Sequence, residues 1–308
     1  MGARTITSAA DKAQARRELA EALHATITEK VEALTGSEAW RAYLDAAMSF
    51  HDYSFRNILL ILAQRPDATR VAGFRSWQGR GRQVRKGEKA IRIYGYSSRT
   101  VTDTDPDTGD ENSRKIPTFP ILSVFDISQT DPIEGHPQPE ELAQLLTGAD
   151  PANIYDRTAA VMTARSWSVT REKIAGTTNG YTTTDGSRRI VVEADLEPAA
   201  AAKTMLHEAG HAHIHIPQIT DPEARKDLHR GRMEVEAESV AYVLAGVQGL
   251  DTSAYSVGYI AGWADGDIET ITDTAQTVLK AVHELAEALD RRDAEQEADS
   301  AEESGSAA

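Results

Sequence analysis

The sequence predicts an α+β chain of two domains, and three observations support this prediction. The 308 residues exceed the length of a typical single domain, while 40% hydrophobic and 26% charged residues are ordinary for globular proteins. Apolar residues recur with helical spacing in most of the chain, but between residues 71 and 126 their spacing is that of strands. A segment rich in proline and turn residues then separates the two halves.

The first predicted domain, residues 1–127, is helical at its start and contains a small antiparallel sheet. Three helices are expected because apolar residues recur every three or four positions, with Ser37 as an N-cap and Pro66 as a stop. The pattern then alternates like strands on either side of a glycine-rich basic turn, and a long polar hairpin loop lies before the last strand. The expected elements are helices over residues 8–34, from Ser37, and from about Ser54 to Gln64, and strands within residues 71–78, 89–96 and 117–126.

A linker is predicted at residues 128–150, where prolines and turn residues interrupt the chain. The second domain, residues 151–290, combines several helices with a small β meander, in which Asp185-Gly186 favours a hairpin turn. Residues 291–308 hold six acids and no apolar group larger than alanine, which predicts a disordered acidic tail. The expected elements are a helix over residues 151–165, the meander over 166–195, and helices from Pro198 to about Ile216 and over roughly 231–247, 253–265 and 267–290.

The composition narrows the possible functions. The absence of cysteine excludes disulfides, thiolate metal sites and cysteine nucleophiles, and it agrees with a reducing cytoplasm. The longest apolar run, Ile58–Ala63, is far shorter than the roughly 20 residues of a membrane span, and no secretory signal is visible at the N-terminus. A cytoplasmic protein without a membrane partner is therefore expected. The net charge of −15 would argue against a nucleic-acid partner if it were evenly spread.

The charge is unevenly spread along the chain. Residues 51–100 contain eleven basic and three acidic residues, a net charge of +8, so the remainder carries −23. Cations interleaved with aromatic rings suit single-stranded DNA, because phosphates attract cations and unpaired bases stack on flat surfaces. The alternative is that Phe74 and Trp77 are core residues and that the arginines only solubilise the chain. The candidate DNA-binding residues are Arg70, Arg75, Trp77, Arg80, Arg82, Arg85, Lys86, Lys89 and Arg92, with Phe74, Tyr94 and Tyr96 as further rings.

A metal-binding motif lies in the helix predicted from Pro198. His207-Glu208-Ala209-Gly210-His211 places two imidazoles four residues apart, so both point from one face of a helix. A catalytic zinc site needs three protein ligands and one open position, and Glu208 can serve as the general base. The motif predicts one Zn²⁺ per chain, held by His207 and His211, and a zinc metallopeptidase activity. Gly210 is expected to allow close approach of another helix.

The third ligand is expected on the following helix. A histidine six residues after His211 is excluded, because Pro217 occupies that position. Glu234 and Glu238 share one helix face beside small residues. Glu234 is favoured, and Glu238 is the alternative ligand or a partner that orients a ligand imidazole. Glu236 points elsewhere, and the simplest alternative is that all three glutamates are solvated.

Two further features surround the motif. The strand Arg189–Val192 shortly precedes the helix and could align a substrate along its edge. His213 and His215 extend the row of histidines. His215 could reach the same helix face as His211, but a capping or surface position is the favoured interpretation.

These segments together resemble a known family. The stretch Tyr53–Ile93 is similar to the N-terminal domain of ArdC-type antirestriction proteins, and the segments LHEAGHAHIH and EVEAESVAYVLA resemble the zincin-like metallopeptidase domain of that family and of the wider ImmA/IrrE group. The two motifs in this order are specific, although neither would suffice alone. The matching residues are Asn57 to Leu60, Gln64 to Ala68, Trp77, Gly81 to Lys89, and Glu234, Ala237 and Ala241.

The resemblance implies a single-stranded DNA-binding antirestriction protein of a mobile element, with a zincin-like metallopeptidase domain and Glu234 as the third metal ligand. An alternative is an ImmA-like site-specific metalloprotease that acts on a regulatory protein and uses DNA for localisation. A third possibility is a non-catalytic DNA-binding protein with a structural metal site. Glu208 argues against the third possibility, because a structural site needs no general base. The expected partners are single-stranded DNA and, for a protease, a protein substrate.

Overall fold

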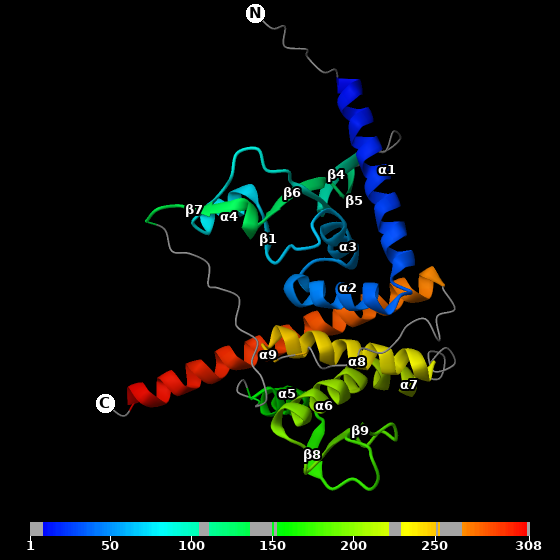
Figure 1. Cartoon of the computed structure of the whole chain (residues 1–308), viewed down its shortest axis with the longest axis vertical. Helices are drawn as coiled ribbons and strands as arrows, with labels where there is room; N and C mark the ends of the chain where they lie inside the picture. The colour runs from blue at the N-terminus through cyan, green and yellow to red at the C-terminus, as the bar shows by residue number, and fades with distance from the viewer. Residues whose placement is uncertain are drawn as a thin grey trace, which may run out of the picture. The chain divides into compact units, whose positions relative to one another are not determined.

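The computed structural model describes residues 9–104, 111–135, 150, 153–221, 229–250, 252 and 267–306. The chain forms two compact units, whose helices and strands are labelled in Figure 1. Unit 1 comprises Met1–Lys30 and Arg56–Glu140, and unit 2 comprises Val31–Phe55 and Glu141–Ala308. The mixture of helices and strands confirms the predicted α+β class. Within the described ranges, no helix combines the length and the apolar character that crossing a membrane requires.

Unit 1 contains a three-stranded antiparallel sheet of order β1-β6-β3, and β2 pairs separately with β7. The small antiparallel sheet predicted from the sequence is therefore present. The apolar run Ile58–Ile61 of α3 is at most 1% exposed and forms part of the core. The elements are α1 (Ala9–Ala33), α3 (Phe55–Gln64), β1 (Val71–Gly73), α4 (Phe74–Gly79), β2 (Arg82–Val84), β3 (Ile91–Tyr94), β4 (Ser97–Thr104), β5 (Glu111–Thr118), β6 (Ile121–Asp126), the 3₁₀ turn η1 (Ile127–Gln129) and β7 (Thr130–Pro132).

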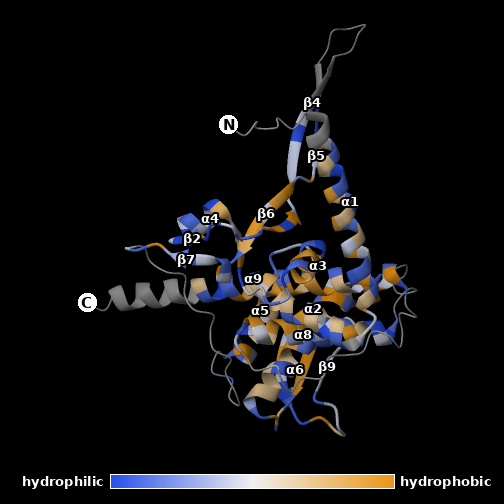
Figure 2. Ribbon diagram, turned by 45° about the horizontal axis from the view of Figure 1, so that its top comes forward, coloured by the Kyte–Doolittle hydropathy of each residue, from blue (hydrophilic) through white to orange (hydrophobic). Residues whose placement is uncertain are grey.

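The segment predicted as a long polar hairpin loop is mostly strand. β4 and β5 pair along their full length, and their register continues that of β3 and β6 without a shift. The strands β3–β4 and β5–β6 therefore form one continuous antiparallel ribbon, which is apolar at β6 and polar beyond it (Figure 2). Polarity does not prevent pairing here, because threonine favours strands and backbone hydrogen bonds hold the ladder.

Two amide side chains of α3 close the outer edge of the sheet. β3 lies at this edge, where unpaired backbone N–H and C=O groups would otherwise be exposed. Asn57 donates from Nδ2 to the carbonyl oxygen of Tyr94 (2.8 Å) and accepts at Oδ1 from the N–H of Tyr94 (2.9 Å). Gln64 makes the same pair of bonds with Arg92, at 2.9 and 2.8 Å. The two amides thus replace a neighbouring strand.

Replacing Asn57 with alanine should destabilise the protein by about 1–3 kcal/mol, because two backbone groups of Tyr94 lose their partner beside a largely buried position. Replacing Gln64, whose side chain is exposed, should cost less, since water can take over its bonds. The free energies of unfolding from urea titrations of both variants test this expectation. Equal losses in the two variants would contradict the role of the buried amide.

The segment predicted as the first strand is only partly strand. β1 is short, and the helix α4 follows it directly. Trp77 in α4 is fully buried against Ala72 and Val84, and its Nε1 donates to the carbonyl oxygen of Phe125 (2.8 Å). Burial of the indole, with its polar N–H satisfied, explains why this residue enters the core.

Unit 2 packs a group of helices against a three-stranded sheet of order β8-β10-β9, in which β10 is parallel to β8 and antiparallel to β9. The predicted sequential meander is therefore wrong. β10 takes the central position because Ile190–Val192 is apolar throughout and fully buried. Gly186 has the positive φ of 86° that its turn requires. The elements are α2 (Ser37–Phe50), α5 (Ile154–Ala164), β8 (Ser168–Glu172), β9 (Gly180–Thr182), β10 (Arg189–Glu193), α6 (Pro198–Gly210), the π-helical turn η2 (His211–His215), α7 (Ile216–Thr220), α8 (Arg230–Val247) and α9 (Ile268–Ser306).

α8 is the most buried helix of unit 2 and packs against α6, α9 and α2 (Figure 2). From α2, Trp40 donates to Oγ of Ser239 (3.3 Å), and the Tyr43 hydroxyl donates to the carbonyl oxygen of Ala275 (3.2 Å). Both aromatic side chains are at most 1% exposed. The predicted first domain, residues 1–127, therefore differs from unit 1, because α2 buries its aromatic face in unit 2.

Two helices continue beyond their predicted ends. The helix from Pro198 passes through the π-helical turn η2 and continues as α7 past Pro217 to Thr220. The wider π turn accommodates this proline, whose ring would clash with the carbonyl four residues earlier in a regular helix. α9 extends to Ser306 through the segment predicted to be a disordered tail, whose alanines and glutamates favour helix. The helix predicted at 253–265, and most of the linker, lie outside the described residues.

Candidate metal centre and basic surface

α6, the π-helical turn and α8 bring together three side chains of the kinds that bind metal ions. Nε2 of His207 and Nε2 of His211 are 3.1 Å apart. Oε2 of Glu234 lies 3.6 Å from Nε2 of His207 and 3.7 Å from Nε2 of His211. These are the three residues that the sequence predicts as ligands. In the part of the chain that the structure describes, their ligand atoms all lie within 4.8 Å of one another.

The spacing of the three atoms fits a tetrahedral metal ion. Ligand atoms about 2.1 Å from a zinc ion are separated by about 3.4 Å at tetrahedral angles. Close packing of the two helices makes this spacing possible, because a Cβ atom on Gly210 would lie 3.3 Å from Cα of Ala237. Two imidazoles and one carboxylate suit a divalent transition metal and leave a coordination position open for water or substrate.

Glu238 contacts the outer nitrogen of His207. Its Oε2 lies 3.1 Å from Nδ1 of His207, and its Oε1 lies 2.6 Å from Nζ of Lys203. Nδ1 faces away from the other ligand atoms, so this contact orients the imidazole instead of adding a ligand. The geometry thus distinguishes the two glutamates that the sequence leaves as alternatives. Glu234 lies in the ligand group, whereas Glu238 contacts the far nitrogen of His207.

A buried chain of polar contacts holds the second imidazole. Nδ1 of His211 lies 2.9 Å from Nδ1 of His215, and Nε2 of His215 lies 2.9 Å from Oε2 of Glu236. Arg232 donates from Nε to Oε1 of the same carboxylate (2.7 Å). When Nε2 of His211 binds a metal, its Nδ1 carries the proton and donates to His215, which in turn donates to Glu236.

The positions of His215 and Glu236 differ from the interpretation of the sequence. His215 is 1% exposed and Glu236 is 3% exposed, whereas a surface histidine and a solvated glutamate are expected. Glu236 does point away from Glu234, as predicted. That second face of α8 is nevertheless buried, because it packs against the turn that carries His215. Helical spacing alone cannot show that a helix is covered on more than one side.

Burial and ion pairing shift the pKa values of this centre. Burial lowers the pKa of His207, but hydrogen bonds with Glu234 and Glu238 outweigh it and place the value at about 9. Hydrogen bonds from His207 and then His211 hold the pKa of Glu234 far below its usual range. Burial lowers the pKa of His215, which keeps that imidazole neutral at pH 7. Glu234 is therefore ionised and ready to bind a cation, whereas His207 must first lose a proton.

Glu208 lies beside the ligand group without joining it. Its carboxyl is largely buried, and Oγ1 of Thr182 lies 2.8 Å from its Oε2 and 3.0 Å from its carbonyl oxygen. Burial raises the pKa of Glu208, which makes its carboxylate a better proton acceptor than an exposed glutamate. Thr182, on β9, has no sequence signal as a site residue, because it lies 26 positions from Glu208 and reaches it only through the fold.

A cavity of about 600 Å³ opens beside the ligand group. Its walls include Gly180–Thr182 of β9 and the apolar side chains of Ile216, Ile219 and Met233. The strand predicted to align a substrate, Arg189–Val192, is β10, and it cannot do so because β8 and β9 flank it on both sides. β9 is the edge strand at the cavity.

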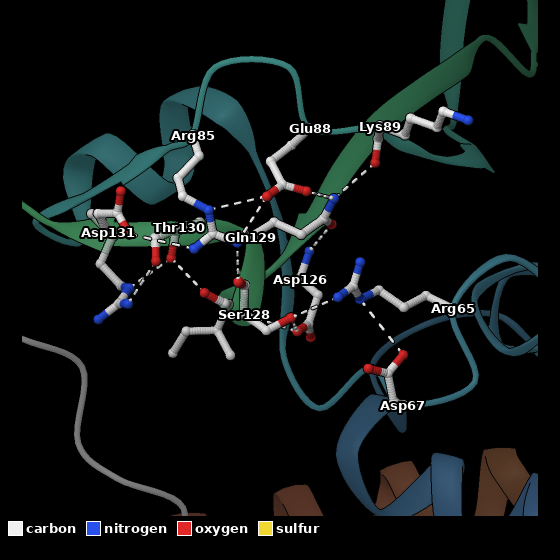
Figure 3. A network of polar contacts seen from close by, with 12 residues as sticks. Arg65, Asp67, Arg85, Glu88, Lys89, Asp126, Ser128, Gln129, Thr130 and Asp131 are labelled. Atoms are coloured by element: carbon white, nitrogen blue, oxygen red, sulfur yellow. Dashed lines mark hydrogen bonds and ion pairs between the residues drawn. The ribbon is translucent and has the colours of Figure 1, made fainter.

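A network of polar contacts holds the glycine-rich basic turn (Figure 3). Arg85 donates to Oε1 of Glu88 (2.8 Å) and to the carbonyl oxygen of Ser128 (2.6 Å). Gln129 donates from Nε2 to Oε2 of Glu88 (3.1 Å) and to the carbonyl oxygen of Lys89 (2.8 Å). Hydrogen bonds from Gln129 and Arg85 hold the pKa of Glu88 below its usual value. The Lys-Gly-Glu-Lys part of the motif therefore fixes the shape of the turn.

The candidate DNA-binding residues fall into two groups. Trp77 faces the core, so the prediction that its ring stacks on a base is wrong. Arg82 donates to Oγ1 of Thr130 (2.7 Å) and Arg85 belongs to the network, so both have structural partners; Arg70 is half-buried. Besides Arg85, the exposed residues of the predicted set are Arg75, Arg80, Lys86, Lys89 and Arg92, of which Arg80 lies 5.7 Å from the centre of the Trp77 ring.

The fold and the ligand group define the class of unit 2. A helix with two histidines four residues apart, completed by a glutamate from a second helix beside a short sheet, is the zincin-like metallopeptidase fold. Residues 166–245 match the IrrE N-terminal-like domain, and residues 17–125 match the N-terminal domain of anti-restriction factor ArdC. The chain therefore has the two-domain architecture of the ArdC family of antirestriction proteins, which confirms the resemblance seen in its motifs.

Individual relatives are distant. An uncharacterized protein of Bacillus anthracis is 26% identical over 311 residues, and the alignment covers 89% of this chain and 51% of that protein. The chain thus spans about half the length of this curated relative. The metal-free crystal structure of antirestriction ArdC protein from the R388 plasmid is 24% identical with a TM-score of 0.48, covering 78% of this chain and 86% of that chain. The Mn(II)-bound structure is 21% identical with a TM-score of 0.47, covering 77% and 85%.

Proposed function

We propose that this chain is an antirestriction protein of a mobile element, which acts in the cytoplasm and binds single-stranded DNA through unit 1 and a zinc ion through unit 2. The observation that carries the proposal is the ArdC-type N-terminal domain joined, in one chain, to a complete His-His-Glu group. By coating an incoming strand, unit 1 would protect it during restriction.

Electrostatics support DNA binding by unit 1. Residues 51–100 carry a net charge of +8 in a chain whose total is −15. Among the described residues, Arg75, Lys86 and Lys89 are exposed and have no hydrogen-bond or ion-pair partner for their side chains, so their charges are available to phosphates. The acidic remainder of the chain would repel DNA and favour its contact with this segment.

The DNA-binding test uses an Arg75→Ala/Lys86→Ala/Lys89→Ala variant. Its affinity for a labelled single strand should fall, and the slope of log K against log salt should become less steep by about 2, since about 0.7 of a counterion is released per phosphate contact. A Lys173→Ala/Lys280→Ala/Arg291→Ala variant removes the same charge from unit 2 and should bind like the wild type. Wild-type binding that is indifferent to salt, or equal binding by both variants, would count against the proposal.

The residues of unit 2 support a proton-transfer role around the metal. His207, His211 and Glu234 would hold the ion, which when bound supplies Lewis acidity for a water and a substrate carbonyl. Glu208 would accept the proton of the attacking water and return it to the leaving amine. Thr182 holds the Glu208 carboxylate in place, and the partners of the two imidazoles fix their orientation.

The second candidate function is an ImmA-like site-specific metalloprotease that acts on a regulatory protein. The buried and hydrogen-bonded Glu208 beside an open cavity favours it, because a purely structural metal site would not need this group. The edge strand β9 would pair with an extended segment of the protein substrate along the cavity.

A phage-restriction assay separates the candidates. Cells carrying the wild type, Glu208→Gln or the Arg75/Lys86/Lys89 variant are compared for protection of incoming DNA, with equal protein levels checked by immunoblot. Protection that survives Glu208→Gln but not the basic variant would support a DNA-binding mechanism without proteolysis. Protection lost in Glu208→Gln, with metal content and DNA binding unchanged, would support proteolysis. Full protection by both variants would refute both mechanisms.

A further inference from the structure

Tyr96 and Phe119 lie opposite each other on the ribbon formed by β3–β4 and β5–β6. They occupy the rung next to the pair Ser97–Thr118, in the register that both ladders share. Their ring centroids are 6.0 Å apart and their planes are inclined by 65°. Two rings that are distant in the sequence thus form one aromatic surface.

Both rings are far more exposed than a packing role requires. Tyr96 is 76% exposed and Phe119 is 63% exposed, whereas Trp77 of the same unit is completely buried. Grouped, exposed apolar side chains on a polar hairpin are typical of a binding surface.

The aromatic pair lies on the face of the ribbon that also carries Tyr94, which is half-buried and donates to the carbonyl oxygen of Ala20 in α1 (3.2 Å). Side chains two residues apart on a strand share a face, and the constant register preserves this alternation through both ladders. Ile91, Ile93 and Val124 occupy the opposite face and are at most 6% exposed, so that face meets the core.

Cations flank the aromatic pair on the same face. Arg92 lies four residues from Tyr96 in one direction along the ribbon, and Lys115 lies four residues from Phe119 in the other. At about 3.3 Å per residue, each cation is about 13 Å along the ribbon from the rings. Both cations are exposed, and Arg92 donates a hydrogen bond to Oγ of Ser123, directly across the ladder.

We infer that Tyr96 and Phe119 form a stacking platform for unpaired bases, with Arg92 and Lys115 contacting the phosphates on either side. This inference rests on the proposed binding of single-stranded DNA by unit 1 and specifies the surface that performs it. A single strand is the fitting occupant, because flat apolar bases alternate in it with anionic phosphates, as rings and cations alternate along this face. The platform takes over the stacking role that Trp77, buried in the core, cannot fill.

The test compares a labelled oligothymidylate with an abasic strand of the same length, whose phosphates are retained. In the full-length protein, Tyr96→Ala/Phe119→Ala should weaken oligothymidylate binding by about ten- to a hundred-fold and leave abasic binding nearly unchanged. Tyr96→Phe/Phe119→Tyr keeps both rings and should bind like the wild type. Ile268→Ala removes an exposed apolar side chain from α9 of unit 2 and should also bind like the wild type.

The outcomes separate this inference from the proposed function. If the wild type binds neither strand, the proposed DNA binding by unit 1 is refuted, and the stacking platform is refuted as well. If the wild type binds with salt dependence but the double-alanine variant binds oligothymidylate equally well, only the platform is wrong. A loss that is equal on both strands, or equal in Ile268→Ala, would also overturn the platform. A change of oligomeric state in the double-alanine variant, without loss of binding, would assign the pair to self-association instead.

Discussion

Replacing Glu234 with alanine should lower the affinity for zinc by more than about 100-fold. Loss of a group that only orients a ligand typically lowers metal affinity by about 10–100-fold. The loss should be larger for Glu234, because its carboxylate would supply a ligand atom itself. Competition titrations with a chromophoric chelator measure this affinity directly. Zinc at a thousand times its dissociation constant should also stabilise the wild type by about 4 kcal/mol, and this effect should disappear in Glu234→Ala.

Two neighbouring glutamates provide matched controls. Glu208→Gln should retain wild-type affinity, because Glu208 lies outside the ligand group. Glu238→Ala should lower the zinc affinity by only about 10–100-fold, since Glu238 contacts Nδ1 of His207 and orients that imidazole. A larger loss in Glu238→Ala than in Glu234→Ala would reverse the two assignments.

The zinc binding that Glu234 supports should itself depend on pH. In the metal-free protein the pKa of His207 is raised from 6.5 to about 9, because its two glutamate partners outweigh burial. A raised pKa stabilises the folded state fully below pH 6.5, and this contribution is lost as the pH rises through about 9. Zinc competes with the same proton, so its affinity should rise over that interval. The unfolding midpoints of metal-free and zinc-loaded protein should diverge as the pH rises, and parallel curves would argue against the assignment.

Replacing Glu236 with leucine should destabilise the metal-free protein by about 3–5 kcal/mol. The carboxylate is 3% exposed and accepts hydrogen bonds from His215 and Arg232, so its removal leaves two polar groups without their partner. Zinc affinity should also fall by about 10–100-fold, because His211 loses the chain of contacts that orients it. Urea unfolding of the metal-free variant and zinc titration of the folded variant measure the two effects separately.

Glu234→Leu is the matched control for stability, because it changes the same residue type on the same helix at a site whose side chain is 53% exposed. In the metal-free protein, Glu234→Leu should lower the free energy of unfolding by about 1 kcal/mol or less. Glu236→Gln keeps the shape of the side chain and can still accept a hydrogen bond from His215. Its free energy of unfolding should therefore lie between those of the two leucine variants. Equal stability of Glu236→Leu and Glu234→Leu would show that the buried chain contributes nothing.

Much of the metal centre could be predicted from the sequence, because its main parts are local. His207 and His211 lie on one helix at a spacing that fixes their common face, and Glu234 follows on the next helix at a position that the small-residue stripe indicates. The chain of contacts from His211 through His215 to Glu236 could not be predicted. His215 and Glu236 read as exposed residues, since nothing in their own segments shows that α8 is covered on a second side.

The basic segment was less predictable, because an aromatic residue among arginines suits both a core and a binding surface. Trp77 enters the core, where a backbone carbonyl satisfies its N–H. Tyr96 and Phe119 meet because the strand register places them opposite each other, whereas the sequence predicts only that each lies in a strand. Arg82 and Arg85 have structural partners whose positions no charge pattern reveals.

The sequence by itself determined the α+β class, the order of the basic and metal-binding segments, and the identity of the three candidate ligands, because helical periodicity and motif spacing act within a few residues. The tertiary structure decided which side chains are buried: Trp77, His215 and Glu236 inside, and Tyr96 and Phe119 outside. Burial depends on which surfaces meet, and those contacts join residues that are far apart in the chain. The uneven charge is therefore the sequence's argument for the proposed DNA binding by unit 1, and the register of one ribbon is the structural basis of the proposed stacking platform.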